Sequence, residues 1–257
     1  MFFAKTDNSA GAATISAGSL QDRLAGQLMG LFDKAIEDRK QYYMKNQNKI
    51  PIKKDVAAII NSYATNNTKI SGVAGLVPGA LGMLSAIPEI VAVTRNQIAM
   101  IYDISIAYGH YKVLNKELLV GILGYAMGAG AFGLLSIHGR KILIKRASLR
   151  MMQKLAQLFA GKISQRLLKS MVGKWVPFAG AAALAAWSNY STRQIGKKAV
   201  EILEHKIELD NEIVDTQQFA EKMDRVSDSQ ANIDLEILKV QSLINLMLVD
   251  GRIADEE

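Results

Sequence analysis

Two long stretches of this sequence are almost free of charge, and both are interrupted by glycine. Between Lys69 and Arg95 lie 25 residues whose one charged side chain is that of Glu89, and residues 118–137 are 20 residues without any charge. A run of about 20 apolar residues can cross a bilayer as a helix or form the centre of a soluble helical fold. Each stretch must therefore be buried, either in protein or in lipid.

Glycine and proline limit how the first stretch can fold. Gly75, Pro78, Gly79 and Pro88 all disfavour a continuous helix through it. The sequence predicts two short helical pieces broken at Pro78-Gly79, followed by a helix over about 88–107. In that case Glu89 lies at a helix N-terminus, where a carboxylate is favourable. The alternative is a buried acid that must be paired or protonated.

The second stretch carries a helix-packing pattern. Gly124 and Gly128 have the GxxxG spacing that lets two helices approach closely, in lipid or in a soluble core. Because glycine weakens a helix in water and the run barely reaches a spanning length, we expect residues 118–137 to form a buried helical hairpin. A membrane span is the alternative.

The remainder of the chain reads as helical. Of the 257 residues, 49% are apolar, which is enough for a sizeable core and excludes a mostly disordered chain. Cysteine is absent, which excludes disulfides and thiolate metal sites. Apolar residues recur at three- and four-residue spacing, with loop signals at Asn66-Asn67-Thr68 and Asn189-Tyr190. Further helices are predicted over residues 20–46, 53–64, 192–210, 213–226 and 231–248.

The expected fold is all-α, a compact multi-helix bundle with glycine-rich apolar hairpins and no sheet. We expect a flexible lead over residues 1–19, a helical domain over 20–207 and an acidic helical tail over 208–257.

Charge is distributed very unevenly along the chain. Residues 140–200 contain 13 basic and no acidic residues, whereas residues 201–257 contain 5 basic and 15 acidic ones. Such asymmetry points to an anionic surface, a nucleic acid or an internal partner.

The most basic part is predicted to be an amphipathic helix or helix pair over residues 140–172, a pattern typical of membrane-surface helices. Anionic membrane lipid is the favoured partner, because the neighbouring runs are apolar. Nucleic acid is disfavoured, because Phe159 is the one aromatic side chain available for stacking. The acidic tail, which could also bind a protein partner, is the alternative occupant of this basic face. The predicted lipid-binding residues are Arg140, Lys141, Lys145, Arg146, Arg150, Lys154, Lys162, Arg166 and Lys169.

A second set of residues is predicted to serve membrane insertion or close packing. It consists of Gly75, Pro78, Gly79, Pro88, Gly124, Gly128, Trp175 and Pro177.

Catalytic patterns are weak. Residues 128–133 match GxGxxG, but they lie in an apolar helical run and no acid follows at the required distance. His110, His138 and His205 are far apart in sequence, and the terminal acids from Asp250 onward are expected to be frayed. We therefore expect no catalytic residues, no metal, no cofactor and no enzymatic activity.

Several weak motifs in order resemble the EcsC family over about residues 55–207. They are Gly79-Ala-Leu-Gly, Ile87-Pro88, Tyr108-Gly109, Trp175-Val-Pro-Phe-Ala-Gly-Ala181 and Trp187-Ser-Asn-Tyr190. The resemblance implies an α-helical, membrane-associated protein without a settled activity. Two family acids are replaced here, by Ala86 and by His110-Tyr111. Residues 243–257 resemble the opening of a TerB-like domain of the tellurite-resistance type.

These observations predict an amphitropic helical protein that binds anionic lipid from the cytoplasmic side. It would be cytoplasmic, peripheral or partly inserted at the inner membrane. The alternatives are a pore-forming protein whose apolar hairpins insert and a carrier of lipid or another hydrophobic ligand.

Overall fold

The structure, a computed structural model, describes residues 17–74, 79–128, 133–171 and 177–214. It describes the backbone alone at residues 17–20, 74, 79–86, 162–171, 177–184, 212 and 214. The six α-helices of this part are α1 (Ala17–Lys45), α2 (Val56–Ala74), α3 (Gly79–Ala107), α4 (Lys116–Ala126), α5 (Leu149–Met171) and α6 (Pro177–Leu203). Two 3₁₀ turns, η1 (Gln47–Lys49) and η2 (Lys53–Asp55), connect α1 to α2. The strands are β1 (Leu135–His138), β2 (Lys141–Ala147) and β3 (Lys206–Val214).

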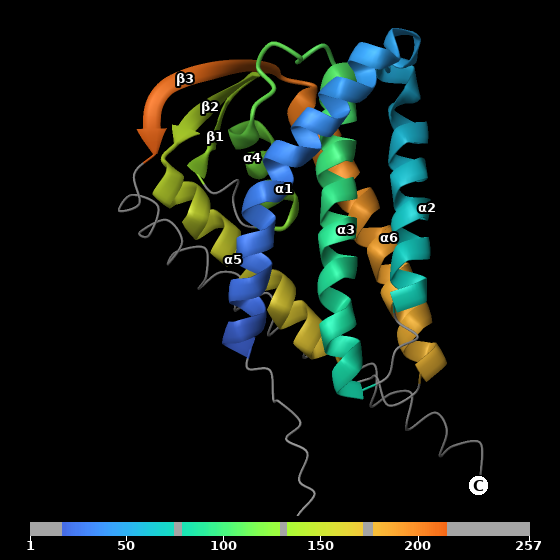
Figure 1. The fold of residues 1–257 in the computed structure, drawn as a ribbon. Helices are drawn as coiled ribbons and strands as arrows, with labels where there is room; N and C mark the ends of the chain where they lie inside the picture. Colours follow the sequence, from blue (N-terminus) through green and yellow to red (C-terminus); the bar gives the residue numbers. More distant parts are fainter. Residues whose placement is uncertain (1–16, 75–78, 129–132, 172–176, 215–257) are drawn as a thin grey trace, which may run out of the picture.

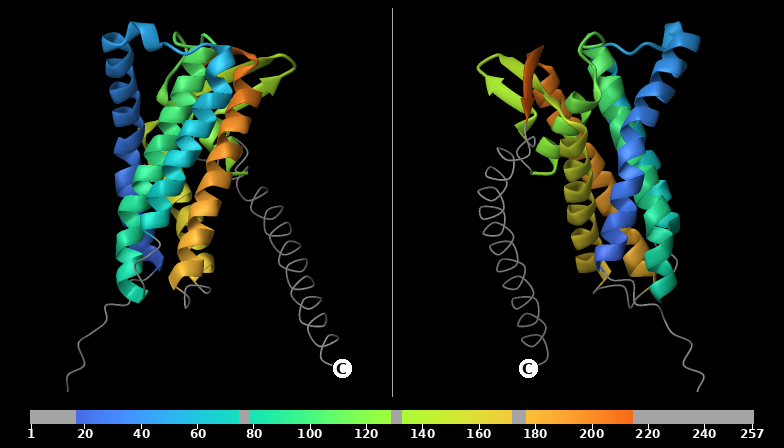
Figure 2. Two further views of the ribbon diagram at one scale, coloured as in Figure 1. Left: turned by 90° about the vertical axis from the view of Figure 1, so that its right-hand side faces the viewer. Right: turned by 60° about the vertical axis from the view of Figure 1, so that its left-hand side comes forward.

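Five long helices lie lengthwise beside one another, and the short α4 lies among them (Figure 1). The three strands form a small sheet at one end of the bundle, which we call the sheet end. The opposite end, the far end, is where α2 and α5 finish and where α3 and α6 begin (Figure 2).

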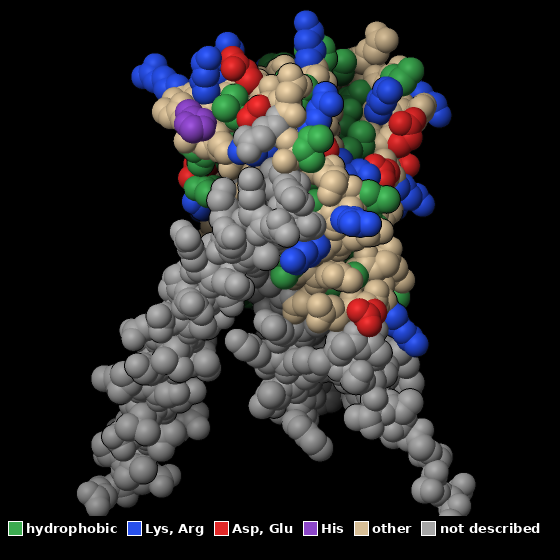
Figure 3. Space-filling view, turned by 90° about the vertical axis from the view of Figure 1, so that its left-hand side faces the viewer, with side chains coloured by type: hydrophobic (Ala, Val, Ile, Leu, Met, Phe, Trp, Pro, Cys, Tyr) green, Lys and Arg blue, Asp and Glu red, His purple; other side chains and the backbone are tan. Residues whose placement is uncertain are grey.

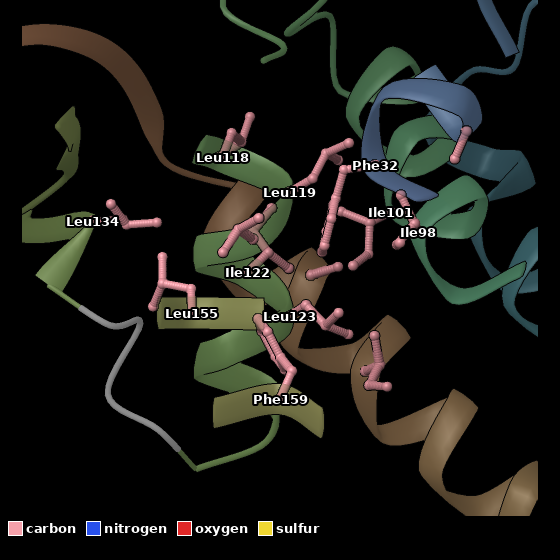
Figure 4. Close-up of a cluster of buried hydrophobic side chains, with 14 of the residues drawn as sticks. Phe32, Ile98, Ile101, Leu118, Leu119, Ile122, Leu123, Leu134, Leu155 and Phe159 are labelled. Atoms are coloured by element: carbon pink, nitrogen blue, oxygen red, sulfur yellow. The ribbon is translucent and has the colours of Figure 1, made fainter. Parts of the chain in front are cut away.

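The centre of the core is α4. Its residues from Leu118 to Gly124 are all buried, and an Asn115 side-chain oxygen caps the helix by accepting the Leu118 N–H at 2.9 Å. Phe32 of α1, Ile101 of α3 and Phe159 of α5 lie around it (Figure 4). The start of the second charge-free stretch is therefore buried in protein, as expected.

The predicted helical hairpin over 118–137 is wrong, because α4 ends at Ala126 and the stretch closes in strand β1. Gly128 has a φ of 73°, so it follows the helix in a left-handed conformation and is not on a helical face with Gly124. The close approach is made by Gly121 instead. A Cβ added there would lie 2.6 Å from Leu135 Cγ, so α4 packs directly on β1.

The expectation of no sheet is also wrong. β1 and β2 form an antiparallel hairpin whose tight turn contains Gly139 with a φ of 60°. β2 also pairs with β3 in parallel, with Ile142 opposite Ile207. Burial alternates along the first half of β2, where Ile142 and Ile144 are buried and Lys141, Leu143 and Lys145 are more exposed, so Ile142 and Ile144 face the core with the period of a strand. The predicted basic helix therefore begins only at Leu149.

Several helix boundaries also differ. α2 runs through Asn66-Asn67-Thr68, and α6 runs through Asn189-Tyr190, where loops were predicted. Side-chain hydrogen bonds explain this, since Asn67 Nδ2 donates to Thr192 Oγ1 at 2.9 Å and Thr68 Oγ1 donates to the Ala64 carbonyl at 2.8 Å. The polar side chains of these residues have hydrogen-bond partners within and between the packed helices, and these bonds outweigh the local preference of the residues for loops.

α3 begins at Gly79 and contains Pro88, whereas a start near Pro88 was predicted. Glu89 therefore lies inside a helix, and the N-terminal explanation for this acid is wrong. The predicted helix 192–210 ends at Leu203 and gives way to β3, and residues 213 and 214 belong to that strand.

The rest of the predicted helix 213–226, and all of 231–248, lie outside the described residues. The start of α1 and the end of α3 before Tyr108-Gly109 are confirmed within three residues.

Candidate functional site

The basic residues predicted to bind lipid divide between the two ends of the molecule. Arg140 lies in the β1–β2 turn, Lys141 and Arg146 lie on β2, and Arg150 lies in the first turn of α5, all of them exposed. Lys145 and Lys154 are half-buried. Lys162, Arg166 and Lys169 belong to the half of α5 that approaches the far end, and their side chains lie outside the described residues.

Acidic side chains accompany the basic ones at the sheet end. Lys141 Nζ lies 3.4 Å from Glu208 Oε1 of β3, and Lys206 Nζ lies 2.7 Å from the same oxygen. The hydrogen bond from Lys206 and the charge of Lys141 lower the pKa of Glu208. Figure 3 shows Lys and Arg mixed with Asp and Glu over this part of the surface. The sheet end is therefore a surface of mixed charge.

The apolar face of α5 packs into the core of the bundle. Met151, Leu155 and Phe159 are buried, and α5 packs against α1. A surface helix inserts into lipid through such a face. While the core is intact, α5 can offer a membrane its charged side chains but not its apolar stripe.

A different feature is found where α2, α3 and α6 lie side by side. Asn67 of α2 bonds to Thr192 of α6, Gln97 of α3 donates to the same Thr192 oxygen at 3.2 Å, and Asn96 donates to Asn67 Oδ1 at 2.7 Å. Asn67, Gln97 and Thr192 are all buried. These bonds fix three helices at a common height, which we call the seam level.

Charge nearly disappears from these three helices between the seam level and the far end. Residues 70–74 of α2 and 177–192 of α6 have no charged side chain, and residues 79–94 of α3 have one, that of Glu89. At 1.5 Å per residue, each 16-residue segment of α3 and α6 is about 24 Å long. We call this region the charge-free pole.

Basic residues mark the boundary of the pole. Lys69, Arg95 and Arg193 lie next to the seam level on α2, α3 and α6, and each has an exposed side chain. Arg193 Nε donates to Asn189 Oδ1 at 2.8 Å, and Arg95 pairs with Asp38 of α1.

Large apolar side chains are exposed just inside the pole. Trp187 is 49% exposed and Tyr190 is 55% exposed, with their ring centroids 5.8 Å apart on α6. Val73 of α2 is 71% exposed. Gly72 and Ala185 face each other across the helix pair, so Val73 lies near the height of Trp187.

Exposed apolar residues also occur at the sheet end, for example Ile50, Ile52 and Leu149, but charged residues flank them in the sequence. Among the exposed large apolar side chains that the structure describes, Val73, Trp187 and Tyr190 are the ones that belong to the charge-free pole.

A buried ionic cluster connects α1, α2 and α3. Arg39 donates to both carboxylate oxygens of Asp103 at 2.7 and 2.8 Å, and the Tyr63 hydroxyl donates to Asp103 Oδ2 at 2.8 Å. Arg39 also bonds to the Tyr43 hydroxyl at 2.9 Å and lies over its ring. Both oxygens of the Asp103 carboxylate therefore accept hydrogen bonds, which is typical of an ion pair that holds helices together.

The electrostatics of this cluster follow from burial. Desolvation raises the pKa of the Asp103 carboxyl, while Arg39 and the Tyr63 hydroxyl oppose that rise. Burial lowers the pKa of Arg39, but the Asp103 carboxylate, together with Tyr63 and Tyr43, outweighs this effect and the pKa is raised. Burial, followed by the Asp103 charge, raises the pKa of Tyr63 and of Tyr43. Sequence reasoning missed the cluster, although Asp103 stands alone among apolar residues of a helix, which is the signal of a paired buried acid.

Other candidate sites carry little chemistry. His110 Nε2 lies 2.7 Å from the Leu203 carbonyl and gives this group at the end of α6 a hydrogen-bond partner. In the described ranges, no group of three or more histidine, aspartate or glutamate side chains could hold a metal. A cavity between Leu28, Phe32, Val120 and Phe159 has a volume of about 10 Å³. A depression of about 410 Å³ along Asn61–Lys69 is lined by α2 alone and is open surface.

The residues predicted for insertion or packing have several different positions. Gly79 and Pro177 are the first residues of α3 and α6, which suits proline because the first helical N–H needs no partner. Pro88 is exposed within α3, and Gly124 is buried in α4. Gly75, Pro78 and Trp175 lie outside the described residues.

Comparison with known proteins gave no relatives. No protein-family model, no curated protein and no solved structure matches the chain. The resemblance to the EcsC and TerB-like families therefore stays a prediction. Among the residues that the structure describes, no helix combines the length and the apolar character that crossing a membrane requires.

Proposed function

We propose that this chain is a non-enzymatic peripheral membrane protein that binds anionic lipid surfaces from the cytoplasmic side. The observation that carries the proposal is the charge-free pole, in which three neighbouring helices have one charged residue between the seam level and the far end. A protein surface in water rarely lacks charge over such a length. A surface in contact with lipid avoids it.

Positive charge beside the pole supports an anionic partner. Lys69, Arg95 and Arg193 border it, and the basic half of α5 runs toward the same end. Near an anionic bilayer each basic residue contributes about 1 kcal/mol of binding free energy, and salt screens this contribution. The proposed mechanism is therefore electrostatic attraction followed by contact of the pole with the bilayer.

The test is co-sedimentation of the purified chain with phosphatidylcholine vesicles, with and without phosphatidylglycerol, at low and high salt. We expect binding to require phosphatidylglycerol and to weaken as salt is raised. Binding that is equal on neutral and anionic vesicles at both salt concentrations would contradict the electrostatic part, and no binding to either would reject the function.

The two alternative functions have weaker support. A carrier needs a cavity for an acyl chain, and the apolar cavity described above has room for about one water molecule. A pore-former would release dye from vesicles at the protein concentrations that give binding, whereas we expect binding without release.

A further inference from the structure

We propose that the protein contacts the membrane through its charge-free pole. In this orientation the Trp187–Tyr190 pair lies at the level of the lipid headgroups and the sheet end is directed away from the bilayer. This inference rests on the proposed function and adds the contact surface and the orientation. The occupant of the surface is an anionic phospholipid bilayer.

The first argument is the order of side chains along α6. From the sheet end toward the far end, the helix presents exposed Arg193, then exposed Tyr190 and Trp187, and then ten residues without charge. A cation, an aromatic pair and an apolar segment, in that order, match the headgroup, interface and acyl layers of a bilayer. Tyrosine and tryptophan favour the interface because each has an apolar ring and a polar atom.

The second argument is that the neighbouring helix has a similar order of side chains near the same height. On α2, exposed Lys69 precedes exposed Val73, and the Gly72–Ala185 contact aligns this part of α2 with Trp187. Lysine and arginine side chains at such a boundary can reach the phosphates while their stems contact apolar groups. The side chains of α2 and those of α6 thus place the proposed interface at a similar level of the bundle.

The third argument is that the bundle can keep its shape in lipid. Apolar burial does not hold helices together where the surroundings are also apolar, so small residues and interhelical hydrogen bonds must do so. Thr192 bonds to both Asn67 and Gln97, and Asn189 Nδ2 donates to Thr68 Oγ1 at 2.9 Å. The polar contacts between α2, α3 and α6 are therefore placed at the proposed bilayer surface.

The experiment uses tryptophan fluorescence, since the chain contains two tryptophans. A Trp175→Phe variant leaves Trp187 as the reporter. A matched control places the reporter at the sheet end, by adding Tyr111→Trp to a Trp175→Phe, Trp187→Phe background, because Tyr111 is exposed after the end of α3. Both variants are mixed with the vesicles used for co-sedimentation, prepared with and without brominated acyl chains.

We expect the Trp187 emission to shift to the blue and to be quenched by brominated lipid, and the emission of the Tyr111→Trp control to do neither. Vesicle binding without a change at Trp187, or with an equal change in the control, would overturn the orientation while leaving the proposed function intact. Failure of both variants and of the unaltered chain to bind vesicles would reject the function itself, and the orientation with it.

A second pair of variants tests the boundary cations. Lys69→Gln with Arg193→Gln removes two charges at the pole, and Arg146→Gln with Arg150→Gln removes two exposed charges at the sheet end. From about 1 kcal/mol per residue, we expect the first pair to weaken binding to anionic vesicles about 30-fold, and the second pair to weaken it much less. The opposite ranking, measured on variants with unchanged circular dichroism, would contradict the proposed orientation.

Discussion

At the scale of single residues, the Arg39–Asp103 pair is a largely buried ion pair that connects two helices. Asp103 is 4% exposed, and three donors converge on its carboxylate from α1 and α2. Such a pair contributes little net stability compared with apolar packing, but removing one partner leaves a buried charge without compensation.

The Asp103→Asn substitution should therefore lower the free energy of unfolding by about 3–5 kcal/mol. The matched control is Asp38→Asn, because Asp38 pairs with Arg95 at an exposed site, where such a pair contributes about 0–1 kcal/mol. Urea denaturation of both variants measures the difference. Similar losses in the two variants would show that the buried cluster does not hold these helices together.

The stability of the folded chain at alkaline pH provides a second test of this cluster, through the hydroxyl of Tyr63. Its pKa is raised above the ordinary value by burial and by the Asp103 charge. The folded state thus keeps a proton that the unfolded chain loses, so this contribution to stability is complete below about pH 10 and falls as the pH rises further. We expect Tyr63→Phe to make the decline above about pH 10 shallower. Urea denaturation of the unaltered chain and of Tyr63→Phe over a series of pH values measures the two slopes, and equal slopes would contradict the contribution assigned to Tyr63.

At the scale of elements, helix pairing depends on where glycine permits close approach. A Cβ added to Gly196 of α6 would lie 2.7 Å from Ile60 Cγ1 of α2, whereas one added to Gly26 of α1 would meet open space. Gly196→Ala should therefore lower the free energy of unfolding by about 1–3 kcal/mol through overpacking. Gly26→Ala should raise it by up to about 1 kcal/mol through helix propensity. Thermal denaturation measures both effects, and a stabilised Gly196→Ala variant would contradict the packing described for α2 and α6.

Element type was predictable where one packing face governs the sequence pattern. α1 was predicted within a few residues, because Leu24, Leu28 and Leu31 repeat along one buried face. β2 was missed because its basic and apolar residues were assigned to the pattern of the following helix. The signal was present in the short apolar run between Lys141 and Lys145 after a Gly139 turn, and in the polar–apolar alternation of Lys206–Asp210 in β3.

The continuity of α2 could not be predicted locally. Asn67 favours a loop in isolation, and its helical conformation depends on Thr192, which is 125 residues away in sequence. Such long-range hydrogen bonds become visible only when the helices are placed side by side.

At the scale of the whole molecule, the charge-free pole and the sheet end differ in charge, and this difference predicts which backbone amides vesicles protect from hydrogen exchange. On addition of phosphatidylglycerol-containing vesicles, amide hydrogen exchange should slow in residues 70–74, 79–94 and 177–192. It should be unchanged in β2 and in the first turn of α5. Peptide-level mass spectrometry can separate these segments, and protection confined to residues 135–150 would reverse the proposed orientation.

The charge-free and basic segments of this surface could be predicted from the sequence, but their arrangement in the folded molecule could not. The charge-free stretches and the basic segment follow from counting residues. Their sorting into a charge-free pole and a sheet end of mixed charge depends on the antiparallel pairing of α2 with α6 and on the Lys141–Glu208 ion pair. Neither contact has a local sequence signal.

The parallel pairing of β2 with β3 limits how this chain can be shortened. β2 is the central strand, and β3 covers one of its edges after the chain has passed through α5 and α6. A fragment truncated at Leu203 would leave the backbone N–H and carbonyl groups along that edge unsatisfied, beside Ile142 and Ile144. Unpaired edges of this kind recruit strands from other molecules. Such a fragment should self-associate in plain buffer, so any aggregation it shows would reflect a bare strand and not an affinity for lipid.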